Sequence, residues 1–137
     1  MILVDTCVWL DIFDADERWA TWSLGQVGQW KARGPLLIDE IIYAELCSNF
    51  DRIEALDAAL EQAGVEWSSL SRSALFLAGQ ARALYKRRGG RGGLLPDFLI
   101  GAHALVLGCP ILTRDVSRFR SCFPRLAIVA PAGEEGG

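Results

Sequence analysis

The feature that most constrains the fold is an alternation of short apolar runs with longer stretches of helical spacing. Between the runs, apolar residues such as Ile53, Leu56 and Leu60 recur as they do in amphipathic helices. The runs themselves lack polar–apolar alternation, which is typical of strands covered on both faces of a parallel sheet. They are Met1–Asp5, Pro35–Asp39, Pro110–Asp115 and Leu126–Ala130, with Val65–Trp67 as a weaker fifth. We therefore predict an α/β fold of three layers, in which helices flank a central, mostly parallel sheet of about four to five strands.

The chain has 137 residues, 51% of them hydrophobic, which is enough to bury a core without a disulfide or metal staple. No linker or internal repeat divides it, so we expect one domain over residues 1–131 and a flexible tail over residues 132–137. No apolar run approaches the roughly 18 residues of a membrane span. Asp5 and Asp11 also interrupt the apolar N-terminus before a signal-like stretch can form.

Cysteine content and net charge bear on the compartment and on the partners. The four cysteines lie far apart, form no CxxC pair and, with a single histidine in the chain, make no zinc pattern. We expect buried free thiols, which persist in a reducing cytoplasm. A net charge of −3 argues against wholesale coating of nucleic acid, but such an average can hide a local basic patch.

Three aspartates follow or begin predicted elements. Asp5 ends the first apolar run and Asp115 ends the run that starts at Pro110, and ligands in parallel sheets bind beyond the carboxyl ends of strands. Asp97 follows Pro96 at a predicted helix start, where proline and an acidic residue are both favoured. Because Gly101 and Ala104 share its helix face and are small, we expect that face to approach another backbone closely and to turn Asp97 inward.

A fourth acidic residue, Glu45, lies on a predicted helix that Asp39 caps and that runs through about Ser48. It borders the helix face that Ile41 and Ile42 should bury, so we expect a half-buried carboxylate that needs a partner. Taken singly, it can also be a boundary residue satisfied by an arginine or a backbone donor. The three aspartates, taken singly, can likewise be turn residues or helix caps.

Taken together, the four acidic residues are harder to explain as separate caps and turns. Bringing two like charges to about 4 Å costs roughly 4 kcal/mol at an effective dielectric near 20, so a positive charge must offset them. No lysine is close in sequence to any of the four, and an all-oxygen site without His or Cys suits Mg²⁺ or Mn²⁺. The hydroxyls of Thr6 and Thr113 are placed to donate hydrogen bonds to these carboxylates.

One dense basic patch precedes Asp97. It contains Arg82, Lys86, Arg87, Arg88 and Arg91, and the glycines near its end allow backbone and guanidinium groups to approach phosphates. The alternative is a helix C-terminus with its usual cations and a glycine stop. Arg114 and Arg118, which flank Asp115, are further candidates for contact with the phosphates of a nucleic acid. His103 falls within the predicted helix and is expected to be a packed histidine.

Three other classes of acidic or phosphate site fit the sequence less well. A haloacid-dehalogenase-type phosphatase has a second Asp two residues after the first, and here that position is Cys7. A phosphate-receiving signalling domain needs a lysine near a late strand end, but the only lysines are Lys31 and Lys86. A P-loop is excluded because Gly89–Gly93 lacks the GK[ST] ending.

Four motifs in order resemble those of PIN-domain nucleases, and among them the VapC-type toxins of bacterial toxin–antitoxin modules. The motifs are Val4-Asp5-Thr6, Ala44-Glu45-Leu46, Pro96-Asp97-Phe-Leu-Ile-Gly-Ala102 and Leu112-Thr-Arg-Asp-Val-Ser-Arg-Phe119. The likeness covers nearly the whole chain at typical spacing, except for the C-terminal tail. It implies a PIN-like fold with a homodimeric assembly and an antitoxin whose peptide occupies a groove near the site.

The resemblance also implies an activity, that of an endoribonuclease dependent on Mg²⁺ or Mn²⁺. Asp5, Glu45, Asp97 and Asp115 match the family's acidic residues, with Asp5, Asp97 and Asp115 as metal ligands and either Glu45 or Asp97 as general base. The segment before Glu45 is unusually acidic, which leaves Glu40 as a minor rival. The alternative is a PIN-like RNA-binding or protein-interaction module without turnover, for which a missing acidic residue would be the sign, and none is missing.

Overall fold

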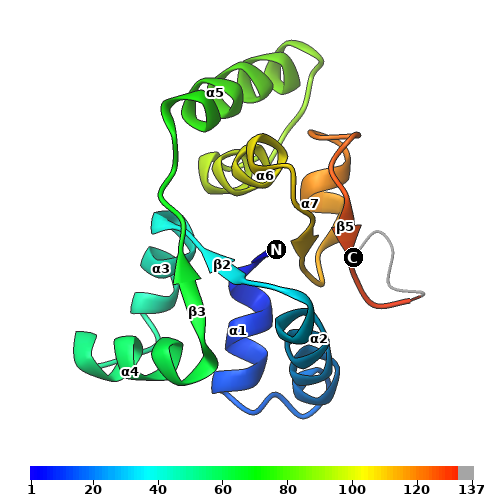
Figure 1. Cartoon of the computed structure of the whole chain (residues 1–137). Coiled ribbons are helices and arrows are strands. Elements are labelled where there is room, and N and C mark those ends of the chain that lie inside the picture. The colour runs from blue at the N-terminus through cyan, green and yellow to red at the C-terminus, as the bar shows by residue number, and fades with distance from the viewer. Residues whose placement is uncertain (133–137) are drawn as a thin grey trace.

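A parallel sheet of five strands forms the centre of the computed structural model, which describes residues 1–132 (Figure 1). The strand order is β3-β2-β1-β4-β5, and every neighbouring pair is parallel. The strands are β1 (Ile2–Val4), β2 (Leu36–Ile38), β3 (Val65–Trp67), β4 (Ile111–Leu112) and β5 (Ile128–Val129). Each lies within one of the predicted apolar runs, so the predicted sheet is confirmed.

Helices connect the strands and cover the sheet. They are α1 (Thr6–Phe13), α2 (Ala20–Arg33), α3 (Glu40–Cys47), α4 (Ile53–Ala63), α5 (Arg72–Arg87), α6 (Leu95–Leu107) and α7 (Val116–Arg120). From β1 the chain moves outward through β2 to β3, then returns across the sheet to β4 and β5. Right-handed crossovers in the two directions put their helices on opposite faces. Figure 1 shows α1 and α2 on one side of the sheet and α6 on the other.

The three inner strands are hydrophobic throughout because both faces of the sheet are covered. Every residue of β1, β2 and β4 is buried, and the buried core continues into Trp9 of α1, Ile42 and Leu46 of α3, and Phe98 of α6. The outer strand β3 is half-buried to exposed, in keeping with its weaker sequence pattern. Burial of inner strands without polar alternation is the property from which the parallel sheet was predicted.

The chain reverses its direction of travel across the sheet between β1 and β4, which are neighbours. Leu3 pairs with Ile111 and Val4 with Leu112, so the next residues, Asp5 and Thr113, emerge side by side. The Asp5 amide donates to the Leu112 carbonyl at 2.9 Å and extends the ladder to that point. A crevice beyond the carboxyl ends of two such strands is the usual ligand position in open parallel sheets.

The small face of α6 packs closely against aromatic side chains. Our prediction that it approaches another backbone was wrong. A Cβ atom built on Gly101 would lie 2.5 Å from Cε2 of Phe123 and 3.3 Å from Cδ1 of Phe119, both of which are buried. The absence of a side chain at Gly101 therefore makes room for two aromatic rings. This packing sets the distance between α6, which carries Asp97, and the segment that carries Asp115.

The expected buried thiols are only partly found. All four cysteines are free, but Cys109 alone is buried, Cys7 and Cys122 are half-buried, and Cys47 is exposed on α3. Within residues 1–132 no helix is both long and apolar enough to cross a membrane. Most of the predicted flexible tail, residues 133–137, lies outside the described residues.

We predict that Gly101→Ala destabilises the fold by about 1 to 3 kcal/mol, because the added methyl group overpacks the Phe119 and Phe123 rings. Gly79→Ala on α5 is the matched control, since nothing lies within 4 Å of its added Cβ and a helical alanine should gain about 0.5 to 1 kcal/mol. Urea unfolding of both variants measures the difference. Equal stability of the two variants would contradict this account of the α6 packing.

Candidate active site

Asp5 is the most buried of the four acidic residues, with no exposed surface. It follows β1 and caps α1, and its Oδ1 accepts a hydrogen bond from the Thr6 amide at 2.8 Å. Its Oδ2 accepts from the Thr113 hydroxyl at 2.8 Å and from the Cys7 thiol at 3.6 Å. Donors from the ends of both central strands therefore fix this carboxylate.

The guanidinium of Arg118 lies among three of the carboxylates. Its Nη1 donates to Asp5 Oδ2 at 3.0 Å, and its Nε donates to Asp97 Oδ1 at 2.9 Å. Nη2 makes a second hydrogen bond to the same Asp97 oxygen. Asp115 is more exposed, and its Oδ2 lies 3.9 Å from Arg118 Nε. Residues after β1, at the start of α6 and before α7 thus converge on one positive charge.

Glu45 joins this group through a threonine. It is half-buried on α3, and its Oε1 accepts a hydrogen bond from the Thr6 hydroxyl at 2.7 Å. Thr6 thus binds Asp5 through its amide and Glu45 through its side chain. Glu40, the rival position, is exposed and accepts instead from the Leu70 amide at 2.9 Å. The structure places Glu45, and not Glu40, beside the other acidic residues.

The pKa values of these groups reflect a shared, desolvated environment. Burial raises the pKa of Asp5, although Arg118, Thr113 and Thr6 oppose the shift. Burial also raises the pKa of Glu45, and the negative charges of Asp5 and Asp97 add to that shift. For Arg118, burial lowers the pKa, but the neighbouring carboxylates outweigh it and raise the pKa above its ordinary value. Arg118 is therefore a permanent cation here.

Arg118 was considered from the sequence as an RNA contact, and its function as the counter-charge of the acidic residues was missed. No lysine lies close in sequence to the four acidic residues, so the sequence predicts a metal ion as their counter-charge. The available signal was the spacing in α7, where Arg118 follows Asp115 by three residues and shares its side of a helical turn.

The donor set suits a hard divalent cation, since carboxylate oxygens from three chain segments face one positive charge. Their present spacing suits the guanidinium instead. Among residues 1–132, no three His, Cys, Asp or Glu side chains stand close enough together to hold a metal ion. The residues fit a magnesium or manganese ion in their chemistry, provided that Arg118 gives up its position.

Comparison with known proteins gives the family. The family model of the PIN domain matches residues 2–121, a span that contains Asp5, Glu45, Asp97 and Asp115. This chain belongs to the PIN domain family. A search of curated proteins found no relative.

Solved structures show the same fold in distant relatives of this PIN domain. A chain of VapBC2 from Rickettsia felis, bound to a DNA fragment from their promoter, has a TM-score of 0.75 at 20% identity, covering 96% of this chain and 99% of that one. VapBC-1 from nontypeable Haemophilus influenzae has a TM-score of 0.73 at 20% identity, covering 95% of this chain and 98% of that one. A chain of a toxin–antitoxin complex from Klebsiella pneumoniae has a TM-score of 0.68 at 22% identity, covering 96% of this chain and 98% of that one.

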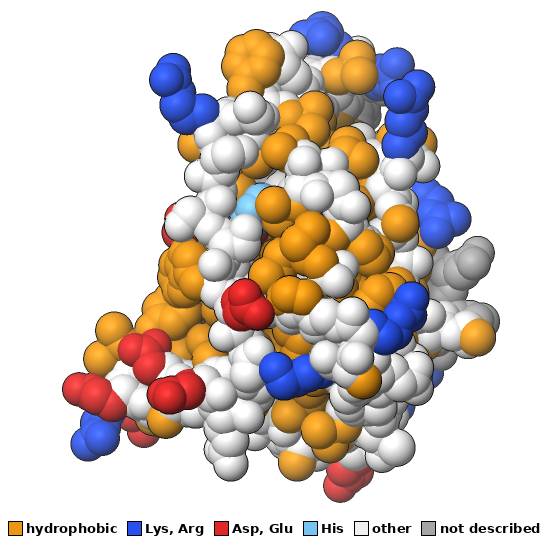
Figure 2. Space-filling view, viewed as in Figure 1, with side chains coloured by type: hydrophobic (Ala, Val, Ile, Leu, Met, Phe, Trp, Pro, Cys, Tyr) orange, Lys and Arg blue, Asp and Glu red, His pale blue; other side chains and the backbone are white. Residues whose placement is uncertain are grey.

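The basic patch of this PIN domain lies where α5 ends. Lys86, Arg87, Arg88 and Arg91 are all exposed, and Figure 2 shows Lys and Arg side chains gathered in this upper part of the molecule. Arg91 lines a small pocket together with Asp97 and Arg118, so the patch reaches the acidic residues at this point. Of these four cationic residues, Arg91 is the one that lines this pocket.

Arg114, another predicted RNA contact, is held by Asp11. Its Nε and Nη2 donate to the two Asp11 carboxylate oxygens at 2.8 and 2.9 Å. Asp11 is buried and also accepts from the Ser23 hydroxyl at 2.6 Å. A part of the Arg114 charge is thus used to bind the segment after β4 to α1 and α2.

His103 is a packed histidine, as predicted. It is buried on α6, and its Nδ1 lies 2.8 Å from Oδ2 of Asp39, the buried N-cap of α3. The other Asp39 oxygen accepts from the Ile41 and Ile42 amides at 3.0 Å. This pair ties α3, which carries Glu45, to α6, which carries Asp97.

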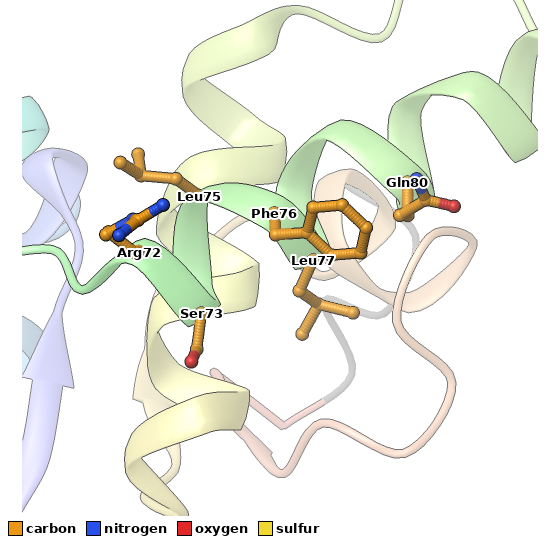
Figure 3. Close-up of a pocket in the computed structure, with 6 residues that line it drawn as sticks. All are labelled: Arg72, Ser73, Leu75, Phe76, Leu77 and Gln80. Carbon is orange, nitrogen blue, oxygen red and sulfur yellow. The ribbon is translucent and has the colours of Figure 1, made fainter.

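A broad surface hollow on α5 has different chemistry. Its lining comes from that helix alone and consists of Arg72, Ser73, Leu75, Phe76, Leu77 and Gln80 (Figure 3). Phe76 is 71% exposed, and no carboxylate lines the hollow. Its lining therefore lacks the acidic groups that surround Arg118.

We predict that Arg118→Gln destabilises the protein by about 3 kcal/mol at pH 7, because buried Asp5 loses its counter-charge. Loss of Arg118 should raise the pKa of Asp5 further above its unfolded value. The loss of unfolding free energy in the variant is then complete where Asp5 is ionised. It becomes smaller as the pH falls toward about 4, because protonation of Asp5 removes the unpaired charge. Urea unfolding at several pH values measures it.

Arg120→Gln is the control for that prediction, since Arg120 is exposed on the same short helix. It should change the free energy of unfolding by less than about 0.5 kcal/mol. A deficit in Arg118→Gln that stays constant with pH would contradict the pairing of Arg118 with the carboxylates.

Proposed function

We propose that this PIN domain is a metal-dependent endoribonuclease and the toxin of a toxin–antitoxin pair. The observation that carries the proposal is the convergence of Asp5, Asp97 and Asp115 from three chain segments on one cationic group. A site that gathers carboxylates in this way is built to hold a positive charge. PIN-family membership and the resemblance of the four acidic motifs support a nuclease.

Asp5, Asp97 and Asp115 would hold Mg²⁺ or Mn²⁺. A bound divalent ion supplies an activated water and stabilises charge on the phosphodiester oxygens. Asp5 is already oriented for ligation, since Thr6 and Thr113 fix both of its oxygens. Glu45 and Asp97 are the two carboxylates that can take the proton of the attacking water, and Thr6 holds Glu45 at Oε1.

Arg118 has to leave its position before a metal ion can bind between the same oxygens. The exchange would bring more positive charge to the carboxylates, because a divalent ion replaces the monovalent guanidinium. Its side chain is 24% exposed, so a path to solvent exists. If Arg118 never moves, its place among the carboxylates favours the alternative function, an RNA-binding or protein-interaction module without turnover. Cleavage assays separate these functions.

The partners follow from the same proposal. Basic side chains would contact the phosphates of the RNA substrate, which is the sequence-independent part of RNA binding. They are Lys86, Arg87, Arg88, Arg91 and Arg114. The structural neighbours include a complex described as toxin–antitoxin, which supports a cognate antitoxin as the protein partner. We also propose a homodimer, which rests on the family resemblance. A cytoplasmic location is proposed as well, and it rests on the four free thiols.

We predict that the purified protein cleaves single-stranded RNA with Mg²⁺ or Mn²⁺ and not in EDTA. Asp97→Asn should lower the cleavage rate by about a hundredfold or more, because it removes a ligand charge while keeping the hydrogen-bond acceptor for Arg118. Asp5→Asn should do the same. Gel assays with a labelled RNA measure cleavage, and circular dichroism shows whether each variant is folded.

Asp51→Asn is the control, because Asp51 is exposed in the loop between α3 and α4, and it should leave the rate unchanged. Full cleavage in EDTA, or wild-type rates in folded Asp97→Asn protein, would rule out the proposed metal chemistry. RNA binding without any cleavage in either metal would leave the module without turnover as the function.

A further inference from the structure

A hollow of about 510 Å³ lies beside the outer strand β3, between that strand and the helices α3 and α4. Buried Ile38 and Leu60 give it an apolar lining, and the rings of Tyr43 and Trp67 add an aromatic one. Within the described residues, the lining contains none of the four acidic residues of the candidate active site. The chemistry proposed above therefore makes no use of this hollow.

Two aromatic rings meet in the hollow. The centroids of the Tyr43 and Trp67 rings are 5.1 Å apart, and their planes are inclined at 56° to each other. Trp67 is 50% exposed, and its indole Nε1 donates to the Ser69 hydroxyl at 3.2 Å, which orients the ring. An aromatic face that is held in place and open to solvent attracts a cation through the ring quadrupole.

Two carboxylates of α4 complete the lining. Asp57 and Glu61 are both exposed, and their spacing of one helical turn puts them on the same face of α4. The Tyr43 hydroxyl donates to Oδ1 of Asp57 at 2.6 Å and so holds this carboxylate beside the ring. Among residues 1–132, no hydrogen bond or ion pair engages Oδ2 of Asp57 or the carboxylate of Glu61. These oxygens are therefore available to a cation from another molecule.

The segment around the hollow, residues 51–66, carries an excess of negative charge. Figure 2 shows Asp and Glu side chains gathered at the lower left, where Figure 1 places α4. Arg52 is the one basic residue of this segment. Its acidic residues are Asp51, Glu54, Asp57, Glu61 and Glu66. Such a surface attracts a cationic partner and repels the phosphates of a nucleic acid.

We propose that this hollow binds an arginine side chain from a basic segment of a partner protein. The guanidinium lies against the Tyr43 and Trp67 rings. Its edge donates to Asp57 and Glu61, while its methylene groups contact the apolar lining. Arginine fits better than lysine because its planar fork stacks on an aromatic face and pairs with carboxylates at the same time. The inference goes beyond the proposed function, since no step of RNA cleavage uses this surface.

The position of β3 in the sheet explains why the arginine belongs to a polypeptide. β3 is an outer strand, and among residues 1–132 the only strand that pairs with it is β2. The outer edge of such a strand offers backbone donors and acceptors to an extended segment of another protein. Val65 and Trp67 belong both to β3 and to the lining of the hollow, so a segment along this edge can place a side chain in it.

The test of location follows the indole N–H signals of the five tryptophans in ¹⁵N-labelled protein as a peptide is added in EDTA. The probe is a capped peptide in which arginines alternate with serines. We expect the Trp67 signal, identified by its loss in Trp67→Phe, to shift while the other indole signals stay in place. The same peptide with citrulline for arginine keeps the shape without the charge and should cause no shift.

The test of the carboxylates is fluorescence anisotropy of the same arginine peptide labelled with fluorescein. Glu61→Gln should weaken binding by about twofold to fivefold, the effect of losing one exposed ion pair. Glu66→Gln is the matched control, because Glu66 is also exposed but alternates with Val65 and Trp67 along β3 and so points to the opposite face of the sheet. At physiological salt it should leave the affinity nearly unchanged.

An unmoved Trp67 signal, an equal shift with the citrulline peptide, or equal effects of Glu61→Gln and Glu66→Gln would overturn the arginine pocket. So would a Trp67 shift caused by single-stranded RNA and not by the arginine peptide. These measurements need neither a metal ion nor cleavage, so they fail or succeed separately from the nuclease proposal. RNA cleavage by a protein whose Trp67 signal does not move would leave the nuclease and remove the pocket.

Discussion

The ion-pair network around Arg118 is the interaction on which the site depends. Asp5 is fully buried, and its carboxylate shares one guanidinium with Asp97 while Asp115 lies at the edge. Without a cation, two carboxylates at about 4 Å would repel each other by roughly 4 kcal/mol at an effective dielectric near 20. Arg118 removes that repulsion and ties the end of β1, the start of α6 and the segment before α7 together. As a consequence, the Arg118 guanidinium occupies the position that a metal ion would need.

The topology explains why these residues meet at all. The chain travels outward from β1 and returns to β4, so the two strands are neighbours although more than a hundred residues separate them. Their carboxyl ends present Asp5 and Thr113 side by side. Close packing at Gly101 brings α6, with Asp97, toward this point, and the buried Asp39–His103 pair fixes α3, with Glu45, against α6. Each acidic residue thus comes from a different element, and the sheet order supplies the common position.

Much of this arrangement could be predicted from the sequence because it depends on local patterns. Apolar runs without alternation predicted the parallel sheet, and the positions of Asp5 directly after β1 and of Asp39 as a cap follow from short-range rules. Asp115 was predicted to close a strand, but it lies beyond β4 as the N-cap residue of α7. The counter-charge could not be assigned in this way. Arg118 reaches Asp5 and Asp97 only through the packing of α7, and Arg114 pairs with Asp11 because the segment after β4 lies against α1. Such pairings depend on tertiary structure, and the spacing of Asp115 and Arg118 indicates only the contact between those two residues.

The central claim is that the acidic residues hold one cation at a time, either Arg118 or a divalent metal ion. A crystal structure of the protein with Mn²⁺, with anomalous scattering data, tests it most directly. We predict an anomalous peak within ligand distance of Asp5 and Asp97 carboxylate oxygens, and an Arg118 guanidinium that no longer donates to either. An Arg118 that keeps both hydrogen bonds at saturating Mn²⁺, with no peak between the carboxylates, would contradict the claim.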